Sequence, residues 1–160
     1  MLIAIPSKGR AGQTESDKLL TSAVFFVPQS EVEDYRKYAK CKVEAVPNDI
    51  KGITKTRNWI LKNTEEKRVV MIDDDLQSQG ALRSVSPYKP ILFRSYITAS
   101  CMGIINDGSY LFDESFPVKE DYEICLRHLE EFGGILAARY LYWQNSHWGD
   151  DGGCKSYRTQ

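Results

Sequence analysis

Val69-Val70-Met71-Ile72 is followed at once by three aspartates, Asp73-Asp74-Asp75. Four consecutive apolar residues are typical of a strand that is buried on both faces of a parallel sheet. In open α/β sheets, ligands bind at the carboxyl ends of parallel strands, where these aspartates would lie. Adjacent carboxylates repel one another, so they need a cation or strong hydrogen-bond donors. The stretch predicts a divalent-metal and diphosphate site; alternatively, the aspartates cap the next helix or face water.

Short apolar runs alternate with helix-like segments through the first half of the chain, which is typical of parallel β-α-β units. The expected strands are residues 2–5, 23–27, 43–46 and 69–72. The expected helices are residues 14–20, 30–39 and 53–62. Ser30 and Glu33 have the spacing of a capping box, which predicts the start of the second helix.

The second half has a weaker pattern up to one strong helix. Gln, Ser, Gly and Pro predict a loop over residues 76–90, followed by a strand over residues 101–105. Apolar residues at helical spacing predict a helix over residues 118–132 with a buried stripe of Val118, Tyr122, Cys125, Leu126, Leu129 and Phe132. A last strand over residues 135–142 and a polar tail over residues 149–160 complete the chain, and one domain over residues 1–160 is expected.

Composition excludes several classes of protein. A chain of 160 residues with 42% hydrophobic and 27% charged residues fits one globular domain. The four cysteines are far apart and form no C-x-x-C pair, so neither a zinc site nor a disulfide framework is indicated. Pro6 interrupts the first apolar stretch, and no apolar run approaches membrane-spanning length, so we expect a cytoplasmic protein without a membrane partner.

Charge is unevenly distributed although the net charge is only −1, which argues against a generally basic, nucleic-acid-binding surface. Residues 35–68 contain ten Lys or Arg and four Asp or Glu, whereas residues 107–134 contain eight acids and two bases. A basic half that faces phosphates and an acidic half that holds metal or catalytic carboxylates would explain this. Solvated helix faces explain it equally well.

Four residues are candidates for binding the nucleotide side of a substrate. Ser7 and Arg10 follow the first expected strand, and Lys55 and Arg57 lie on the third expected helix. Lys8, between Ser7 and Arg10, is a fifth candidate. Arginine offers planar donors that match a phosphate or a uracil carbonyl. A solvated surface charge is the alternative for each of them, and it is the better interpretation for Lys8 and Lys55.

The aspartate strand and its surroundings resemble the A-type glycosyltransferase fold (GT-A), in which an Asp-x-Asp motif holds the metal of a nucleoside diphosphate sugar. Gly52-Ile53-Thr54-Lys55-Thr56-Arg57-Asn58 resembles the Gly-x-x-x-x-Arg-Asn helix start of that family. Phe112-Asp113-Glu114 followed by Glu120-Asp121 resembles its acceptor-side stretch, and His147 matches its late metal-binding histidine. The resemblance implies a Rossmann-like, three-layer α/β sandwich with a mostly parallel sheet.

A closer resemblance is to the phage branch called TET/JBP-associated glycosyltransferases. It rests on residues 5–10 with Thr14, on the helix that contains Tyr35, and on Glu120-Asp121-Tyr122. Members of that branch are inferred to put sugars on hydroxymethylated pyrimidines in DNA. The resemblance implies a nucleoside diphosphate sugar donor such as UDP-glucose, a DNA acceptor and, for a phage protein, the host cytoplasm. Between Asp75 and Cys101 this chain is shorter than the family usually is.

The resemblance also implies a role for each candidate. Asp73 would meet the ribose or the nucleobase, and Asp74 would shape the turn or share metal ligation. Asp75 and His147 would ligate Mn²⁺ or Mg²⁺, and the imidazole favours Mn²⁺. Asp121 would be the general base of an inverting hexosyltransferase.

Other assignments remain open at this point. Glu120 or Asp113 would serve as the base if Asp121 does not, and Glu120 and Asp121 also suit the positive end of a helix. The acceptor could instead be a glycan or a lipid-linked saccharide. A nucleotidyltransferase is less favoured, because residues 7–12 only poorly imitate a glycine-rich loop. A non-catalytic module that binds nucleotide sugars is the last alternative.

Overall fold

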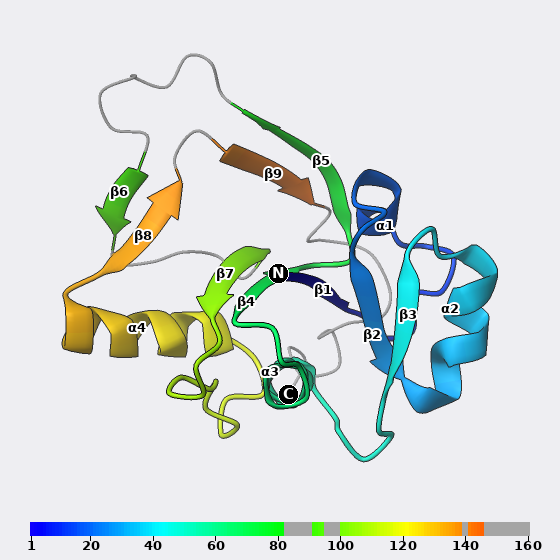
Figure 1. Ribbon diagram of the computed structural model, residues 1–160, viewed down its shortest axis with the longest axis horizontal. Helices are drawn as coiled ribbons and strands as arrows, with labels where there is room; N and C mark the ends of the chain where they lie inside the picture. Colours follow the sequence, from blue (N-terminus) through cyan, green and yellow to red (C-terminus); the bar gives the residue numbers. More distant parts are fainter. Residues whose placement is uncertain (82–90, 95–99, 139–140, 146–160) are drawn as a thin grey trace.

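A computed structural model describes residues 1–81, 91–94, 100–138 and 141–145. Its central sheet has five strands in the order β3-β2-β1-β4-β7 (Figure 1). The strands are β1 (Leu2–Pro6), β2 (Val24–Pro28), β3 (Lys42–Val46), β4 (Arg68–Ile72) and β7 (Cys101–Ile105). The first four are parallel to one another and β7 is antiparallel to β4. The mostly parallel sheet predicted from the alternating pattern is confirmed.

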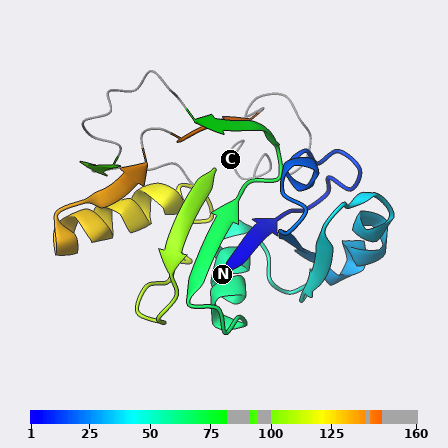
Figure 2. The same ribbon diagram turned by 45° about the horizontal axis from the view of Figure 1, so that its top comes forward.

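Helices cover both faces of this sheet. They are α1 (Ser16–Leu19), α2 (Val32–Tyr38) after the 3-10 turn η1 (Gln29–Glu31), α3 (Ile53–Lys62) and α4 (Glu120–Phe132). Successive strand residues point to opposite faces. One face packs against α3 and α4, and the other face packs against α2. Figure 2 shows β1, β4 and β7 side by side with α3 against them. The predicted three-layer α/β sandwich is therefore confirmed.

The order of the strands creates a switch point between β1 and β4. The chain steps from β1 to β2 to β3 in one direction, then returns across the sheet to place β4 on the other side of β1. Crossovers between parallel strands are almost always right-handed, so such a reversal puts the helices on either side of it on opposite faces. At a switch point, the loops that follow the two strands diverge and leave room for a ligand. The carboxyl ends of β1 and β4 are therefore where a site is expected.

The second half of the chain differs from the sequence prediction. Where a loop over residues 76–90 was expected, residues Leu76–Ala81 form a strand, β5, that pairs antiparallel with β9 (Leu141–Asn145). β6 (Ile91–Arg94) pairs with β8 (Ile135–Ala138), so the single expected strand over residues 135–142 is two strands. These strands are defined by partners far away in the chain, which local composition does not reveal. The predicted tail over residues 149–160 lies outside the described residues.

The start and the rotation of α4 also differ from the prediction. The helix begins at Glu120, two residues later than expected. The predicted stripe of apolar residues is only partly its buried face, because Tyr122 and Leu126 are 52% and 59% exposed. Cys125 is buried as predicted, together with Glu120 and Ile124, which lie outside the predicted stripe. Residues 120 and 124 share one face of a helix, so the inward side chain of Glu120 fixes this rotation.

Smaller differences occur at the other helices. α1 is four residues long and covers only part of residues 14–20. The predicted capping box is wrong, since Ser30 lies in η1 and α2 begins at Val32 without a side-chain cap. The backbone N–H of Ser30 instead donates to Asn48 Oδ1 at 3.1 Å. Within the described ranges, no helix combines the length and the apolar character needed to cross a membrane.

Candidate functional site

The aspartate cluster lies at the switch point, beyond the end of β4. Ala4 of β1 is level with Met71 of β4, so continuing the register brings Ser7 level with Asp74. The backbone N–H of Asp73 donates to the Ser100 carbonyl at 3.1 Å, which ties the start of the cluster to the residue before β7. The cluster is thus held between the loop after β1 and the strand at the edge of the sheet.

Asp74 faces inward and holds the loop after β1. Its carboxylate accepts hydrogen bonds from Ser7 Oγ and, at 2.6 Å, from Arg10 NH1. The residue is 7% exposed, and its backbone carbonyl accepts the N–H of Glu15 at 3.0 Å. Of the two roles that the resemblance left open for Asp74, this geometry matches shaping the turn, because both carboxylate oxygens already bind protein donors.

Tyr35 of α2 completes this network from the far side. Its hydroxyl lies 2.6 Å from Ser7 Oγ and accepts the backbone N–H of Arg10 at 3.1 Å. Burial raises the pKa of Tyr35 to about 12, although the hydrogen bond with Ser7 opposes the rise. Sequence reasoning did not assign Tyr35 to the site, because a tyrosine at an inward helix position looks like an ordinary core residue.

Ser16 is a second residue that sequence reasoning missed. It is fully buried in α1, and its hydroxyl donates to the Asp73 carbonyl at 2.5 Å. The same oxygen accepts the backbone N–H of Leu76 at 2.9 Å. Ser16 therefore clamps the aspartate cluster at both ends. A serine near the start of a short helix gives no local signal of this long-range contact.

Asp73 and Asp75 flank the buried Asp74 and have more exposed side chains, at 29% and 14%. Asp73 Oδ1 lies 3.3 Å from Arg57 NH2, and Asp75 Oδ2 lies 3.7 Å from Arg10 NH1. The middle carboxylate therefore binds protein donors through both oxygens, Asp73 is the most exposed of the three, and Asp75 has one buried carboxylate oxygen, Oδ1.

The donor set fits a divalent ion that is shared with a substrate. Within the described part of the chain, no three His, Cys, Asp or Glu side chains form a group that could hold a metal. Mg²⁺ is usually bound through one or two carboxylates plus substrate phosphates and water, so Asp73 and Asp75 suit that mode. His147, the other predicted metal ligand, lies outside the described residues.

Arg57 is buried between two carboxylates. It is 2% exposed, and it donates through NH1 to Glu120 Oε1 and through NH2 to Asp73 Oδ1. Burial raises the pKa of Glu120, and the Arg57 guanidinium opposes that rise. The sequence prediction placed Arg57 against the nucleotide, but in this structure its guanidinium faces two protein carboxylates. Lys55, two residues earlier in the first turn of α3, is exposed.

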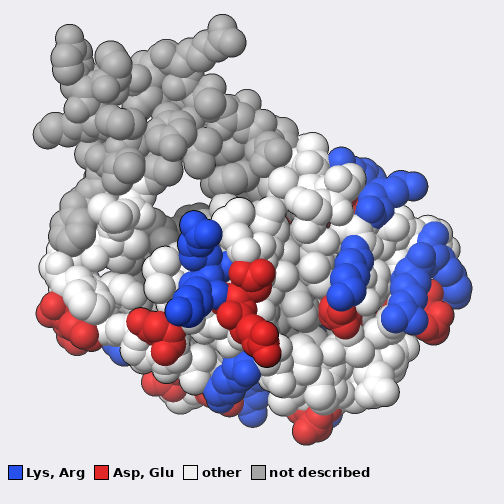
Figure 3. Space-filling model, viewed as in Figure 1, with Lys and Arg blue, Asp and Glu red and all other residues white. Residues whose placement is uncertain are grey.

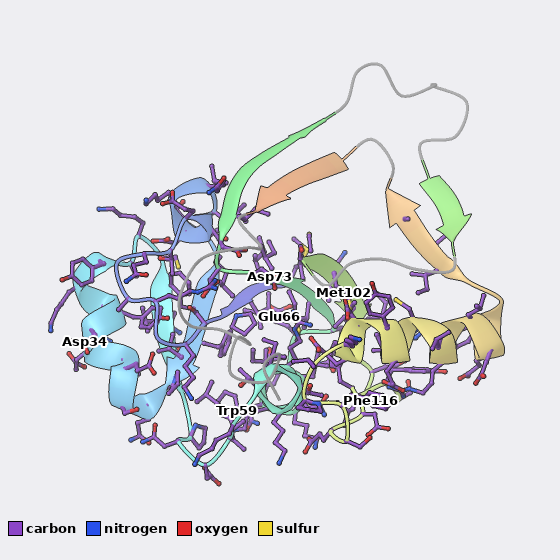
Figure 4. The ribbon with its side chains drawn as sticks, turned by 180° about the vertical axis from the view of Figure 1, so that it is seen from behind. Asp34, Trp59, Glu66, Asp73, Met102 and Phe116 are labelled. Atoms are coloured by element: carbon purple, nitrogen blue, oxygen red, sulfur yellow. The ribbon has the colours of Figure 1, made fainter. Side chains whose placement is uncertain are left out.

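Two further polar residues of α3 hold the segment that leads to α4. Asn58 Nδ2 donates to the Phe112 carbonyl at 2.8 Å, and Asn58 Oδ1 accepts the Phe112 N–H at 2.8 Å. Thr54 Oγ1 donates to the Phe116 carbonyl at 2.5 Å. In Figure 4, Phe116 lies beside α3 and Asp73 lies beyond the end of β4. The predicted acceptor-side stretch is thus fastened to α3, close to the aspartates.

The base candidates occupy different environments. Asp121 is half-buried at the start of α4, directly after the buried Glu120. Asp113 is exposed, and hydrogen bonds from Ser115 lower its pKa. Glu120 is committed to Arg57. Of these carboxylates, Asp121 combines proximity to the Arg57 contact with access to solvent.

The basic stretch over residues 35–68 does not form one surface. Three of its cations pair with neighbouring acids, in the ion pairs Arg36–Glu33, Lys37–Asp34 and Lys42–Glu44. Residues 62–68 run from the end of α3 to the start of β4. They therefore lie at the amino ends of the parallel strands, whereas the aspartates lie at the carboxyl ends. Figure 3 shows acidic and basic side chains interspersed over the described part of one face. The predicted division into a basic and an acidic half is therefore not seen there.

Four exposed lysines lie in segments on the carboxyl-end side of the parallel strands, the same side as the aspartates. Lys8 follows β1, Lys51 and Lys55 flank the start of α3, and Lys119 precedes α4. Among the described residues, none of the four forms an ion pair. Lys8 follows the carboxyl end of β1, and Lys51 and Lys55 lie between β3 and the first turn of α3, on the side of the sheet where the aspartates also lie.

The structure thus defines an α/β protein with a cluster of carboxylates at the switch point of its sheet. A sequence model of the family described as TET-Associated Glycosyltransferase matches residues 1–91. The match covers more than half of the chain, so this chain belongs to that glycosyltransferase family. The family resemblance stated from sequence is thereby confirmed. No curated protein matches the chain in sequence.

The solved structures that this chain matches include those of S. aureus TarS. TarS 1–349 is 16% identical with a TM-score of 0.47, and the match covers 78% of this chain and 54% of that one. The same fragment in complex with UDP is 15% identical with a TM-score of 0.46 and the same coverage. The chain thus spans about half the length of TarS 1–349. This distant likeness carries no information about the residues or substrates of the present protein.

Proposed function

We propose that this protein is a metal-dependent, inverting hexosyltransferase that moves a sugar from a nucleoside diphosphate sugar to a 5-hydroxymethylpyrimidine in DNA. The carrying observation is that Asp73 and Glu120 bind the same buried guanidinium. This contact brings the end of β4, with Asp73 and the following aspartates, next to the start of α4, with Asp121. A donor site and a base are the two parts that an inverting transfer requires.

The donor side of the site suits a nucleotide with its diphosphate. Asp75, with Asp73 beside it, would hold Mn²⁺ or Mg²⁺, which neutralises the departing diphosphate when bound. Asp73 is also within reach of a ribose or nucleobase at the more open end of the cluster. Ser7, Arg10 and Asp74 keep the loop after β1 in place, and Lys55 adds charge for phosphate at the rim. His147 remains a proposed metal ligand.

The reaction proceeds by direct displacement. The acceptor hydroxyl oxygen attacks the anomeric carbon, a new C–O bond forms, and the bond from that carbon to the diphosphate oxygen breaks. The diphosphate leaves with the bonding electron pair. The Asp121 carboxylate takes the hydroxyl proton as general base. The buried, paired Glu120 is unsuited to this role, because a base must reach the acceptor.

DNA as acceptor is supported by the four lysines around the site. Lys8, Lys51, Lys55 and Lys119 replace the longer basic stretch as the phosphate-binding surface that we propose. Binding through phosphates releases counterions, so affinity should fall steeply with salt. A base within a duplex must first be extruded, at a cost of a few kcal/mol. Single-stranded DNA is therefore the better first substrate.

The test is transfer of a hexose from UDP-sugars to oligonucleotides that contain 5-hydroxymethyluracil or 5-hydroxymethylcytosine. We expect a hexose mass increase on the digested nucleoside, and none on unmodified DNA, which lacks the hydroxyl. Asp121→Asn should keep donor binding while turnover falls about 10²–10⁴-fold. Asp113→Asn is the matched control and should retain turnover. Slow hydrolysis of a UDP-sugar without any modified nucleoside would leave the donor site standing and favour a glycan acceptor.

Metal dependence has its own test in Asp75→Ala. We expect the folded variant to lose Mn²⁺-dependent binding of the nucleotide, because one of the two carboxylates proposed to hold the metal is gone. Isothermal titration calorimetry with UDP, with and without Mn²⁺, measures this. Glu65→Ala is the control, since Glu65 is exposed before β4 at the opposite edge of the sheet. Unchanged Mn²⁺-dependent affinity in Asp75→Ala would remove the metal assignment.

A further inference from the structure

One guanidinium connects the two halves of the site. Arg57 donates through NH1 to Glu120 and through NH2 to Asp73 at 3.3 Å. The side chains of Arg57 and Glu120 are 3% and 6% exposed, whereas Asp73 is 29% exposed. The contact between Arg57 and Glu120 is therefore buried. The contact between Arg57 and Asp73 lies next to solvent, where a donor would bind.

The same face of α3 holds the rest of the segment before α4. Thr54, Arg57 and Asn58 are spaced as neighbours on one helix face, and all three are buried. They contact Phe116, Glu120 and Phe112 respectively. Ile124, four residues after Glu120 on the same face of α4, is also buried. The position of α4 relative to the aspartates is thus set by α3, with Arg57 at the point nearest the site.

The backbone at the start of α4 needs such an anchor. Lys119 immediately precedes the helix with φ of 65°. It is the one non-glycine residue with positive φ in the described ranges. A lysine in this left-handed conformation is unfavourable and persists only where neighbouring contacts enforce it. The adjacent Glu120, held by Arg57, supplies that constraint.

A buried ion pair is weak evidence for stability alone, because well-packed apolar side chains often serve equally well. A forked guanidinium can instead fix two carboxylates at a set separation, which a lysine cannot do. We propose that Arg57 is a positioning residue that couples Asp73 to Glu120 and thereby sets Asp121 against the donor. This inference rests on the proposed function for its consequence in catalysis, but the coupling itself does not.

The coupling is tested without any substrate by a double-mutant cycle. Asp73→Asn and Glu120→Gln are made singly and together, and their effects on the unfolding equilibrium constant are measured in urea. These two residues share Arg57, so we expect the combined effect to differ from the product of the single effects by about fivefold or more. In an Arg57→Lys background, the ratio of the combined effect to the product of the single effects should approach one. Single effects that simply multiply in the wild-type background would overturn the proposal.

Catalysis supplies the second readout. In Arg57→Lys we expect kcat to fall about 10–100-fold while the donor KM changes less than about threefold, because the base is displaced but the donor site remains. Ile60→Val, a core change in the same helix, should leave both values near wild type. A raised KM with unchanged kcat would overturn the proposal and make Arg57 a donor contact. If wild type transfers and hydrolyses nothing, the proposed function fails, and the cycle still decides the coupling.

Discussion

Helices α2 and α3 follow neighbouring strands, yet they use their polar residues in opposite ways. α2 packs on the sheet through Val32 and Tyr35, and its charges form exposed pairs within the helix. α3 buries Thr54, Arg57 and Asn58, and each of them contacts a distant part of the chain. Exposed pairs contribute little, whereas buried polar groups are expensive to disrupt. The number of charged residues in a helix therefore does not show whether its polar side chains contact distant parts of the chain.

The largest effect in this comparison is expected from Asn58→Ala. It removes the hydrogen bonds to both the N–H and the carbonyl of Phe112, and leaves these backbone groups unpaired in the protein interior. We expect a loss of about 2–4 kcal/mol in the free energy of unfolding, measured by urea denaturation.

Asn63→Ala is the matched control for that variant. Asn63 follows α3 and is exposed, and its side chain donates to the Trp59 carbonyl in the same helix. We expect a loss below about 1 kcal/mol. Equal losses in the two variants would contradict the claim that α3 holds the segment before α4 in place.

An intermediate effect is expected from Tyr35→Phe, which removes the one polar group that α2 sends into the site. At pH 8 the variant should lose about 1–2 kcal/mol of stability, because Ser7 and the Arg10 N–H lose a partner. Tyr38→Phe is the control, since Tyr38 is 59% exposed. An undiminished stability of Tyr35→Phe would mean that the network is not coupled to the fold.

The raised pKa of Tyr35 also predicts how the stability of the protein changes at alkaline pH. The native state keeps the Tyr35 proton up to a pKa of about 12, whereas the unfolded chain releases it near 10.0. The unfolded state therefore binds fewer protons between these values, and stability falls as pH rises through them. Tyr35 accounts for roughly 2–3 kcal/mol of that fall. Urea titrations between pH 9 and 11.5 should show a shallower decline for Tyr35→Phe than for wild type.

The smallest effect is expected from Arg36→Ala. Arg36 pairs with Glu33 one turn earlier on α2, and both side chains are more than half exposed. We expect a change below about 0.5 kcal/mol, and an effect that vanishes in 0.5 M NaCl. A loss as large as that of Asn58→Ala would erase the distinction between the two helices.

Much of the fold was predictable because its signals are local. An apolar run followed by aspartates defines β4 and its functional end without reference to any other part of the chain. The alternation of apolar runs and helical segments likewise predicts the parallel sheet and its covered faces. The second half was harder, since β5 and β9 acquire their structure by pairing across a long separation.

The sequence by itself determined the residue types of the site and the edge of the sheet where they gather. Only the tertiary structure decided which aspartate turns inward, which face of α4 is buried, and that Arg57 binds Glu120 and Asp73. These outcomes depend on contacts between residues far apart in the chain. The energy of a charged group depends on its partner and its burial, and neither is visible in the spacing of residues along a sequence.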